Sequence, residues 1–437
     1  MSATQIFIPL LVTEVVTFLL WIGLSFIFKD RVKGALMTTA FLILFFSYGH
    51  FFDLLKEWLG SIIRHEYMVP VTILLWIVTF YFIKHIKNLK IATQVLNIIG
   101  IGLIGINLFN IISYEIKKPK IVFQNIPKGE TKPVFASDIY YIILDEYASL
   151  STIKKVYHYD NTQFANYLIK KGFYIATKSK TRYSATEKSI AASLNMEYLD
   201  EKADPYQLIK YNRVFSFLKS KGYKIIHFAN YHNSTKHIKY VDLYFNFYEQ
   251  QEYSFLLGDF YMILLNTTLL KPIYSFFVGR YYEGYNRGAI LSTFRNLKKI
   301  PALKGPKFVF AHIMCPHEPF VFGPNGEKVK KEYRNDWKNK KVYLGQYIFV
   351  TKEVKKLVDV ILQKSNSPPI IIIQSDHGPR SRKKRGVYFG DEWQRIFNAY
   401  YLPNKGKEIL YDSISPVNTF RIIFNHYFNT HYTLLED

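Results

Sequence analysis

Long apolar stretches dominate the first quarter of the chain. Four runs with few or no charged residues cover positions 5–28, 35–55, 68–83 and 91–113. Each approaches the roughly 20 residues that a helix needs to cross a bilayer. None shows the alternation of barrel strands, and only helices or closed barrels satisfy their backbone in lipid. The pattern therefore predicts an α-helical transmembrane bundle of about four spans over residues 1–114. Buried helices of a soluble core are a poorer explanation, because short charged loops separate the runs.

The loops between these runs differ in charge, and the difference predicts an orientation. The first loop contains Lys29, Arg31 and Lys33, and the third contains Lys84, Lys87 and Lys90. The second loop balances lysine and arginine against two glutamates. Basic loops stay on the cytoplasmic side. We therefore expect both termini, and everything after Ser113, to lie outside the cytoplasm.

The remainder of the chain alternates between strand-like and helix-like patterns. Residues 115–136 read as a juxtamembrane linker, and residues 137–437 as a separate domain. Short apolar runs predict strands at 139–144, 224–228, 307–312 and 369–374. Amphipathic patterns predict helices at 164–171, 213–221 and 347–363. Such alternation is typical of an α/β domain with a mainly parallel sheet covered by helices on both faces.

One further apolar stretch, residues 255–278, resembles a fifth span. Asp259, Lys271 and Pro272 interrupt it. A span here would also put the two halves of the candidate site described below on opposite sides of the membrane. We expect a pair of helices that rest on the membrane surface or against the transmembrane bundle.

Composition and charge narrow the class of protein. The 437 residues are 49% hydrophobic, which excludes global disorder, and one cysteine excludes an internal disulfide framework. Lys and Arg number 57 against 34 Asp and Glu, a formal charge of +23. Such an excess favours anionic partners: nucleic acid, an anionic membrane surface or phosphate-bearing substrates. Because the domain is expected outside the cytoplasm, we expect no nucleic acid.

Two predicted strands end in side chains that bind metals. Asp145 and Glu146 follow the first strand, and Asp376 and His377 follow the last. Ligands of open α/β sheets collect at the carboxyl ends of strands. Carboxylates with an imidazole suit a divalent cation. An aspartate after a strand is often only a cap, but Asp-His-Gly after a buried strand has no packing role.

A nucleophile candidate lies between these strands. Thr186 stands at the start of a predicted helix, with Ser189 one turn further on. One interpretation is an ordinary N-cap threonine. The other is a hydroxyl at a helix N-terminus, where backbone N–H groups bind an anion and a nearby metal lowers the hydroxyl pKa.

The segment 308–323 offers further candidates. His312 ends a predicted strand, and His317 stands between two prolines. His317 is either part of a structural turn or a substrate ligand. Cys315 is a weaker alternative nucleophile, since a reactive cysteine needs a base and an electropositive site.

These four segments, in their order along the chain, resemble those of the alkaline phosphatase/sulfatase superfamily. The narrower resemblance is to its membrane-anchored bacterial branch, the lipid A phosphoethanolamine transferases and lipoteichoic acid synthases. It covers roughly residues 138–403 and implies the roles of the site residues. The metal ligands would be Asp145 or Glu146, with Thr186, Asp376 and His377; we favour Asp145, because LDEYA resembles the LDG-aromatic pattern of related phosphodiesterases. Thr186 would be the nucleophile, with Ser189 and His317 on the substrate side.

The chain also departs from the family pattern. It lacks the Cys-x-Pro-Ser-Arg element of sulfatases, and Thr186 cannot form their aldehyde, which favours phosphoryl chemistry. No histidine for a second metal follows Asp-His-Gly. A basic segment stands there instead, in which Arg380 and Arg382 either hold an anionic group or belong to a solvated loop. His232 is a further substrate-contact candidate.

The resemblance implies a transferase of the inner membrane with its catalytic domain on the periplasmic or extracellular side. It would move a phosphoryl head group, phosphoethanolamine or phosphoglycerol, from a membrane phospholipid to an envelope glycan or glycolipid through a phospho-threonine intermediate. Zn²⁺ is the favoured cofactor, with Mn²⁺ or Mg²⁺ as alternatives, and we expect a monomer. A phosphatase or phosphodiesterase and a non-catalytic scaffold are the other hypotheses.

Overall fold

The chain divides into two compact units, and the computed structural model describes most of both. The described residues are 3–117, 137–236, 238–247, 259–336, 338–379, 383–384, 387–388 and 391–437. The first unit comprises residues 1–122 and 252–282, and the second comprises residues 123–251 and 283–437.

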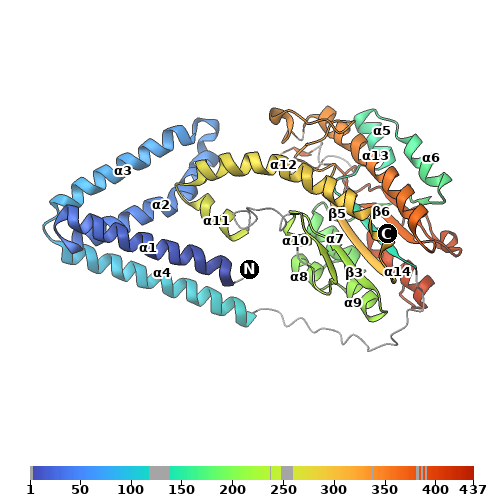
Figure 1. Cartoon of the computed structure of the whole chain (residues 1–437), viewed down its shortest axis with the longest axis horizontal. Coiled ribbons are helices and arrows are strands. Elements are labelled where there is room, and N and C mark those ends of the chain that lie inside the picture. The colour runs from blue at the N-terminus through green and yellow to red at the C-terminus, as the bar shows by residue number, and fades with distance from the viewer. Residues whose placement is uncertain are drawn as a thin grey trace. The chain divides into compact units, whose positions relative to one another are not determined.

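Four long helices form most of the first unit (Figure 1). They are α1 (Ala3–Phe28), α2 (Arg31–Leu59), α3 (His65–His85) and α4 (Leu89–Lys117). All four are long and apolar enough to cross a membrane. Large apolar side chains on α1, α3 and α4 are exposed, as expected of surfaces that face lipid. The prediction of a membrane anchor with about four spans is confirmed.

The apolar stretch at residues 255–278 belongs to this unit. It forms α11 (Asp259–Thr267) and the start of α12 (Lys271–Leu297), with a turn between them. The turn donates a hydrogen bond from the Leu269 amide to the Phe45 carbonyl of α2 at 2.9 Å. A Cβ on Gly49 of α2 would lie 1.9 Å from the Asn266 carbonyl oxygen, so only glycine allows this approach. These contacts place the helix pair against the transmembrane bundle.

The charges of the loops predict that the C-terminus lies outside the cytoplasm, and a reporter fusion can test this orientation. An alkaline phosphatase reporter fused after Asp437 should be active, because that enzyme works only outside the cytoplasm, and a green fluorescent protein fusion at the same site should be dark. The measurement is reporter activity normalised to fusion-protein abundance. The opposite pattern would place the second unit inside the cell and would remove any role for lipids of the outer leaflet.

The second unit is built on a seven-stranded sheet with the order β2-β9-β6-β1-β5-β3-β4. The strands are β1 (Ile139–Leu144), β2 (Tyr174–Ile175), β3 (Lys224–Phe228), β4 (Leu243–Phe245), β5 (Lys307–Ile313), β6 (Ile370–Ser375) and β9 (Asn398–Tyr401). Strands β6, β1, β5, β3 and β4 are parallel, β9 runs antiparallel to β6, and β2 pairs antiparallel with β9 at the edge. A separate hairpin pairs β7 (Lys383–Lys384) with β8 (Val387–Tyr388).

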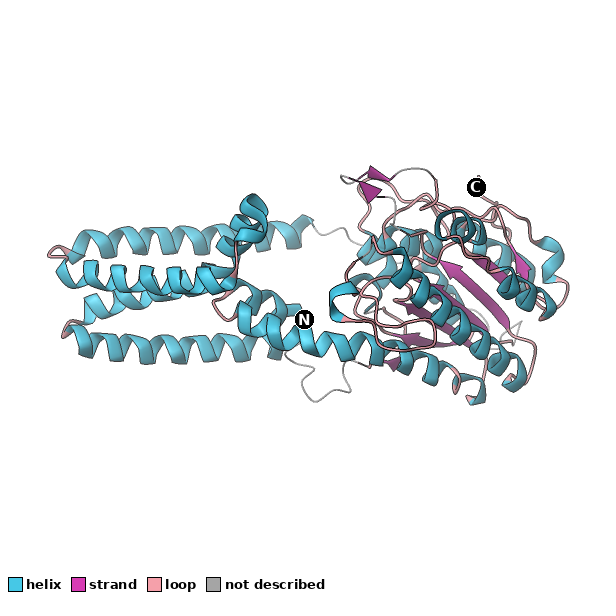
Figure 2. Cartoon of the chain, turned by 90° about the horizontal axis from the view of Figure 1, so that it is seen from above, coloured by secondary structure: helices cyan, strands magenta, loops and turns pink. Residues whose placement is uncertain are grey.

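Helices cover both faces of the sheet, as Figure 2 shows. Alternate residues of each strand point to opposite faces. Tyr140, Ile142 and Leu144 belong to one apolar core, whereas Ile139, Tyr141 and Ile143 belong to the other. The first core includes residues of α5 (Leu150–Tyr157), α6 (Thr162–Lys170), the end of α12 and α13 (Lys340–Lys364). The second includes residues of α7 (Thr186–Asn195), α8 (Pro205–Lys210), α9 (Arg213–Ser220) and α14 (Pro416–Phe428).

The predicted fold class is confirmed, and the differences lie at element ends and sheet edges. β1 and β3 have the predicted bounds, β5 is one residue longer, and β6 is shifted by one residue. α13 begins seven residues before the predicted helix, at Lys340 rather than position 347. The edge strands β2 and β4, the short strand β9 and the helix α14 were not predicted. The short helix α10 (Asn233–Lys236) follows β3 and carries residues that matter below.

Candidate functional site

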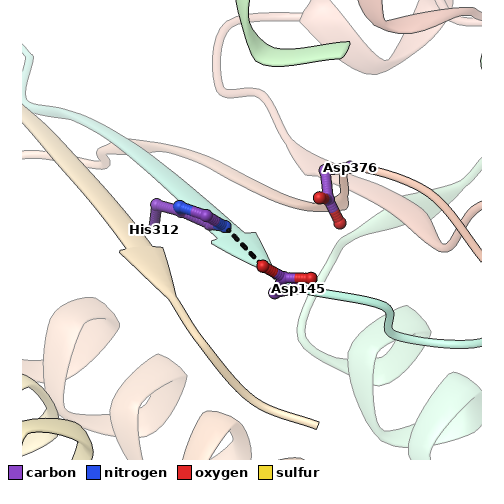
Figure 3. A group of neighbouring side chains, drawn as sticks. All are labelled: Asp145, His312 and Asp376. Carbon is purple, nitrogen blue, oxygen red and sulfur yellow. Dashed lines mark hydrogen bonds and ion pairs between the residues drawn. The ribbon is translucent and has the colours of Figure 1, made fainter. Parts of the chain in front are cut away.

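The alternation of side chains explains why three polar residues meet at one edge of the sheet. Ile143 of β1 is followed two residues later by Asp145, and Phe310 of β5 by His312. In the same way Ile372 of β6 leads through Gln374 to Asp376. All three therefore belong to the face covered by α7. One potential metal-binding atom from each lies within 4.8 Å of the others, and all three residues are buried (Figure 3).

Thr186 lies at the start of the helix that covers this face. It is the first residue of α7 and is only 2% exposed; Ala185 occupies the cap position. No side chain caps this helix, so the structure does not show Thr186 as an N-cap. Its hydroxyl Oγ1 instead lies 3.3 Å from Nε2 of His377. The amides of a first helical turn also point outward without helical partners, as an anion site requires.

The contacts of His377 determine which of its nitrogens faces the site. Nδ1 lies 2.9 Å from the Gly378 carbonyl oxygen, which can only accept, so Nδ1 carries a proton. In the neutral ring Nε2 is then unprotonated, and it lies 3.4 Å from Oδ2 of Asp376. A lone pair and a carboxylate oxygen repel each other unless a cation or a proton lies between them. This pair therefore fits a metal ion.

Asp145 offers a second acceptor of the same kind. Its carboxylate is completely buried, and Oδ1 has no hydrogen-bond partner among the described residues; the same holds for Oδ2 of Asp376. Burial raises the pKa of the Asp145 carboxyl, but the charges of His317, His312 and His377 and the hydrogen bond from His312 outweigh it. The net pKa lies well below its usual range, so Asp145 is ionised. Buried anionic oxygens without donors are the chemistry that a divalent cation satisfies.

The structure distinguishes between the two carboxylates that follow β1. Asp145 belongs to the cluster of potential ligands, and Glu146 does not. Glu146 has φ +58°, a conformation that favours glycine, in agreement with the LDG-aromatic pattern it replaces. Its backbone N–H donates to Oδ1 of Asp376 at 3.1 Å, and its carbonyl accepts from the Tyr343 hydroxyl at 2.7 Å. The backbone of Glu146 thus connects the two carboxylates of the site.

His312 completes the cluster, although the sequence analysis assigned it no role beyond its place at a strand end. Its Nε2 lies 3.2 Å from Oδ2 of Asp145, and both side chains are fully buried. In Figure 3 the dashed contact joins these two residues, while Asp376 lies on the other side of Asp145. The strand register, in which Ile143 pairs with His312, is the signal that could have placed it there.

His317 is held next to the cluster by its backbone. Its N–H donates to the Asp145 carbonyl at 3.2 Å, and its own carbonyl accepts from Nε2 of Gln346 at 2.8 Å. Its Nδ1 lies 2.5 Å from the Glu318 carbonyl, so Nδ1 carries the proton and the neutral ring has its lone pair on Nε2. These contacts fix the ring beside the metal-type ligands.

Ser189 and His232 have local partners in the structure. The Ser189 hydroxyl donates to the Asp376 carbonyl at 2.6 Å and so supports the loop that carries Asp376. Nδ1 of His232 lies 2.8 Å from the Ser234 hydroxyl, and its ring is edge-on to His312. Burial, followed by the charge of His312, lowers the pKa of His232, which favours the neutral ring. Arg380 and Arg382 lie outside the described residues.

Cys315 lacks the environment of a nucleophile. The thiol is fully buried, and burial together with the charge of Asp145 raises its pKa well above its ordinary value. A reactive cysteine requires the opposite shift. The hydroxyl of Thr186 is therefore the better nucleophile candidate.

Comparison with known families agrees with this geometry. A protein-family model described as Sulfatase matches residues 138–420. The match covers more than half of the chain, which therefore belongs to the sulfatase family and is classed as an enzyme. A search of curated proteins gave no match.

Similar solved structures include three proteins with low sequence identity. The periplasmic domain of phosphoethanolamine transferase EptC from Campylobacter jejuni is 13% identical, with a TM-score of 0.44 over 70% of this chain and 92% of that one. The integral membrane protein EptA from Neisseria meningitidis, a lipooligosaccharide phosphoethanolamine transferase, is 11% identical, with a TM-score of 0.42 over 81% and 68%. An alkaline phosphatase superfamily protein from Vibrio parahaemolyticus is 12% identical, with a TM-score of 0.44 over 71% and 72%.

Proposed function

We propose that the protein is a metal-dependent phosphotransferase of the cell envelope, which moves a phosphoryl head group from a membrane phospholipid to an envelope glycan or glycolipid. One observation carries the proposal. The buried hydroxyl of Thr186, at the first position of a helix, lies 3.3 Å from Nε2 of His377, beside carboxylate oxygens that have no donor among the described residues. A hydroxyl between an anion-binding helix end and cation ligands is arranged for attack on phosphorus.

The ligand set favours Zn²⁺. Oδ1 of Asp145, Oδ2 of Asp376, Nε2 of His377 and Oγ1 of Thr186 offer oxygen and nitrogen donors to one ion, and four such ligands suit zinc. When bound, the ion lowers the pKa of the Thr186 hydroxyl and polarises the phosphoryl oxygens of the substrate. Mn²⁺ or Mg²⁺ remain alternatives for the same oxygen-rich set.

The residues of the chain perform two displacements. In the first, Thr186, which has already lost its hydroxyl proton to solvent, forms a bond from Oγ1 to phosphorus, and the bond between phosphorus and the glycerol oxygen of the lipid breaks. Protonated His317 gives the proton at Nε2 to that oxygen, and diacylglycerol leaves. In the second, neutral His317 takes the proton of an acceptor hydroxyl, which attacks the phospho-threonine and releases Thr186. The amides at the start of α7 would bind the equatorial oxygens in both steps.

Three features support transfer of a phosphoryl group from an anionic lipid donor rather than sulfuryl transfer. Four helices are long and apolar enough to anchor the enzyme in the membrane where such a donor resides. The nucleophile position holds threonine, which cannot form the aldehyde of sulfatases. The formal charge of +23 also favours an anionic substrate surface.

A transfer assay tests the proposal. The purified full-length protein is incubated with zinc and phospholipids labelled in the head group, phosphatidylethanolamine in one reaction and phosphatidylglycerol in another, with envelope glycolipids as acceptors. Label should move to the acceptor, and glycolipids from cells with the gene should carry a head group that is missing without it. Release of free head group whether or not acceptor is present would identify a hydrolase instead. No turnover of either lipid, with unchanged glycolipids in the cell, would contradict an enzymatic role at this site.

A further inference from the structure

We propose that Asn230 and His312 form a positioning pair for the metal site, in which His312 is a hydrogen-bond donor to Asp145 and not a metal ligand. The pair holds the Asp145 carboxylate so that one oxygen is hydrogen-bonded and the other faces the cation. This inference rests on the metal site of the proposed function. It concerns two residues that the resemblance to the family did not assign.

The orientation of the Asn230 side-chain amide is fixed by backbone atoms. Its Oδ1 accepts from the His232 N–H at 2.8 Å, and its Nδ2 donates to the His312 carbonyl at 2.6 Å. A backbone N–H can only donate and a carbonyl can only accept. Exchanging the amide oxygen and nitrogen would therefore place a donor against the His232 N–H and an acceptor against the His312 carbonyl. The Thr235 hydroxyl on α10 lies 3.0 Å from Oδ1 and can donate to it. Asn230 is 7% exposed, so water does not substitute for these partners.

The amide orientation in turn fixes the protonation of His312. Nδ2 of Asn230 lies 3.0 Å from Nδ1 of His312. Because Nδ2 can only donate, Nδ1 must accept, and the proton of the ring is on Nε2. The Thr235 hydroxyl, also 3.0 Å from Nδ1, can either donate or accept and is compatible with this assignment. His312 is therefore held as the Nε2–H tautomer.

The proton on Nε2 determines what His312 does in the site. Nε2 lies 3.2 Å from Oδ2 of Asp145, so the N–H donates to this oxygen. A nitrogen that carries a proton has no lone pair for a metal, although His312 is close enough to be counted with the potential ligands. Oδ1 of Asp145 has no donor among the described residues and is left for the ion. Outer partners of this kind orient a ligand and tune its affinity for metal.

Zinc titration of the purified, metal-free, full-length protein tests the proposal with a readout independent of turnover. The His312→Ala variant should bind zinc about 10–100-fold more weakly, the usual loss for an outer partner of a ligand. The His312→Gln variant should bind nearly as well as the wild type. Its amide can both donate to Asp145 and accept from Asn230. If His312 were a ligand, glutamine would fail as alanine does. His426→Gln, on the exposed surface of α14, is the control for the substitution itself.

The tautomer can be measured directly in the unsubstituted protein, which covers the case in which a variant fails to fold. The protein is labelled with ¹⁵N-histidine, and the His312 signals are identified by their loss in the His312→Gln variant, or by their shift in Asn230→Asp. Without zinc, the spectrum should show a protonated Nε2 and an unprotonated Nδ1, and added zinc should not remove the proton from Nε2. A protonated Nδ1, or loss of the Nε2 proton on adding zinc, would overturn the proposal. Failure of lipid transfer alone would contradict the proposed function and leave this result standing.

Discussion

Replacing Thr186 with valine should lower the rate of head-group transfer by about 10⁴-fold or more, because removing the nucleophile forfeits roughly 5 kcal/mol or more of barrier lowering. Valine keeps the branched shape of threonine and lacks only the hydroxyl. Thr186 does not cap α7, so the substitution removes no helix cap and the fold should be preserved. The measurement is the transfer rate of purified protein, with the circular dichroism spectrum as the check on folding.

Two further variants separate a chemical role from a structural one. Thr186→Ser keeps the hydroxyl and should retain part of the activity. Ser193→Ala removes another buried hydroxyl of the same helix, one that contacts Tyr141 at 2.7 Å and the Pro416 carbonyl at 3.2 Å, and should leave the rate nearly unchanged. The wild type incubated with donor lipid alone should gain the mass of a head group on the peptide that contains Thr186. An active Thr186→Val protein, or an adduct on Cys315, would refute the mechanism.

Elements with a strong local signal could be predicted from the sequence. The run of six apolar residues in β1 and the long apolar stretches of α1 to α4 strongly favour one interpretation, because such patterns are stable only when buried or in lipid. β9 (NAYY) is four residues long and has a buried asparagine. Its pairing with β6 comes from tertiary contacts that no local pattern contains, so the antiparallel edge was missed.

The candidate site was predictable to the extent that its residues stand at strand ends or helix starts. Asp145, Asp376, His377 and Thr186 were selected on that basis, and the structure brings them together. The sequence favoured Asp145 over Glu146 only through the family pattern, whereas the structure includes Asp145 in the cluster and places Glu146 in a turn with φ +58°. Ser189 was assigned to substrate binding from the family pattern alone. In the structure its hydroxyl instead donates to the Asp376 carbonyl and so supports the loop that carries Asp376.

The role of His312 could not be derived from the sequence. It depends on Asn230, which is 82 positions away in the loop after β3, and on backbone atoms that orient the amide. A histidine near two aspartates suggests a ligand on composition alone. The hydrogen-bond directions support a donor instead, and direction is a property of the folded chain.

Replacing Asp376 with asparagine should abolish zinc binding and transfer while leaving the metal-free protein at least as stable as the metal-free wild type. The substitution keeps Oδ1, which accepts from the Glu146 N–H at 3.1 Å. An amide nitrogen would replace Oδ2, which lies 3.4 Å from Nε2 of His377. The amide N–H can donate a hydrogen bond to the lone pair of Nε2. In the metal-free protein this N–H therefore takes the place of the cation as the positive partner of that nitrogen. Loss of a direct ligand should weaken zinc binding by more than about 100-fold, beyond the range for outer partners.

The measurement that separates these effects is the thermal midpoint of the purified protein with and without zinc, together with metal content and transfer rate. Zinc at 100 times its dissociation constant should stabilise the wild type by about 2.7 kcal/mol, because it binds only the folded state. The Asp376→Asn variant should show no such shift and no transfer, with an unchanged or higher midpoint in the absence of metal. Asp412→Asn is the matched control, because its carboxylate is exposed and contacts Tyr174 away from the cluster. If Asp376→Asn were instead destabilised in the absence of metal, a proton and not a lone pair would face Asp376 in the wild type, and His377 would no longer be available as a ligand.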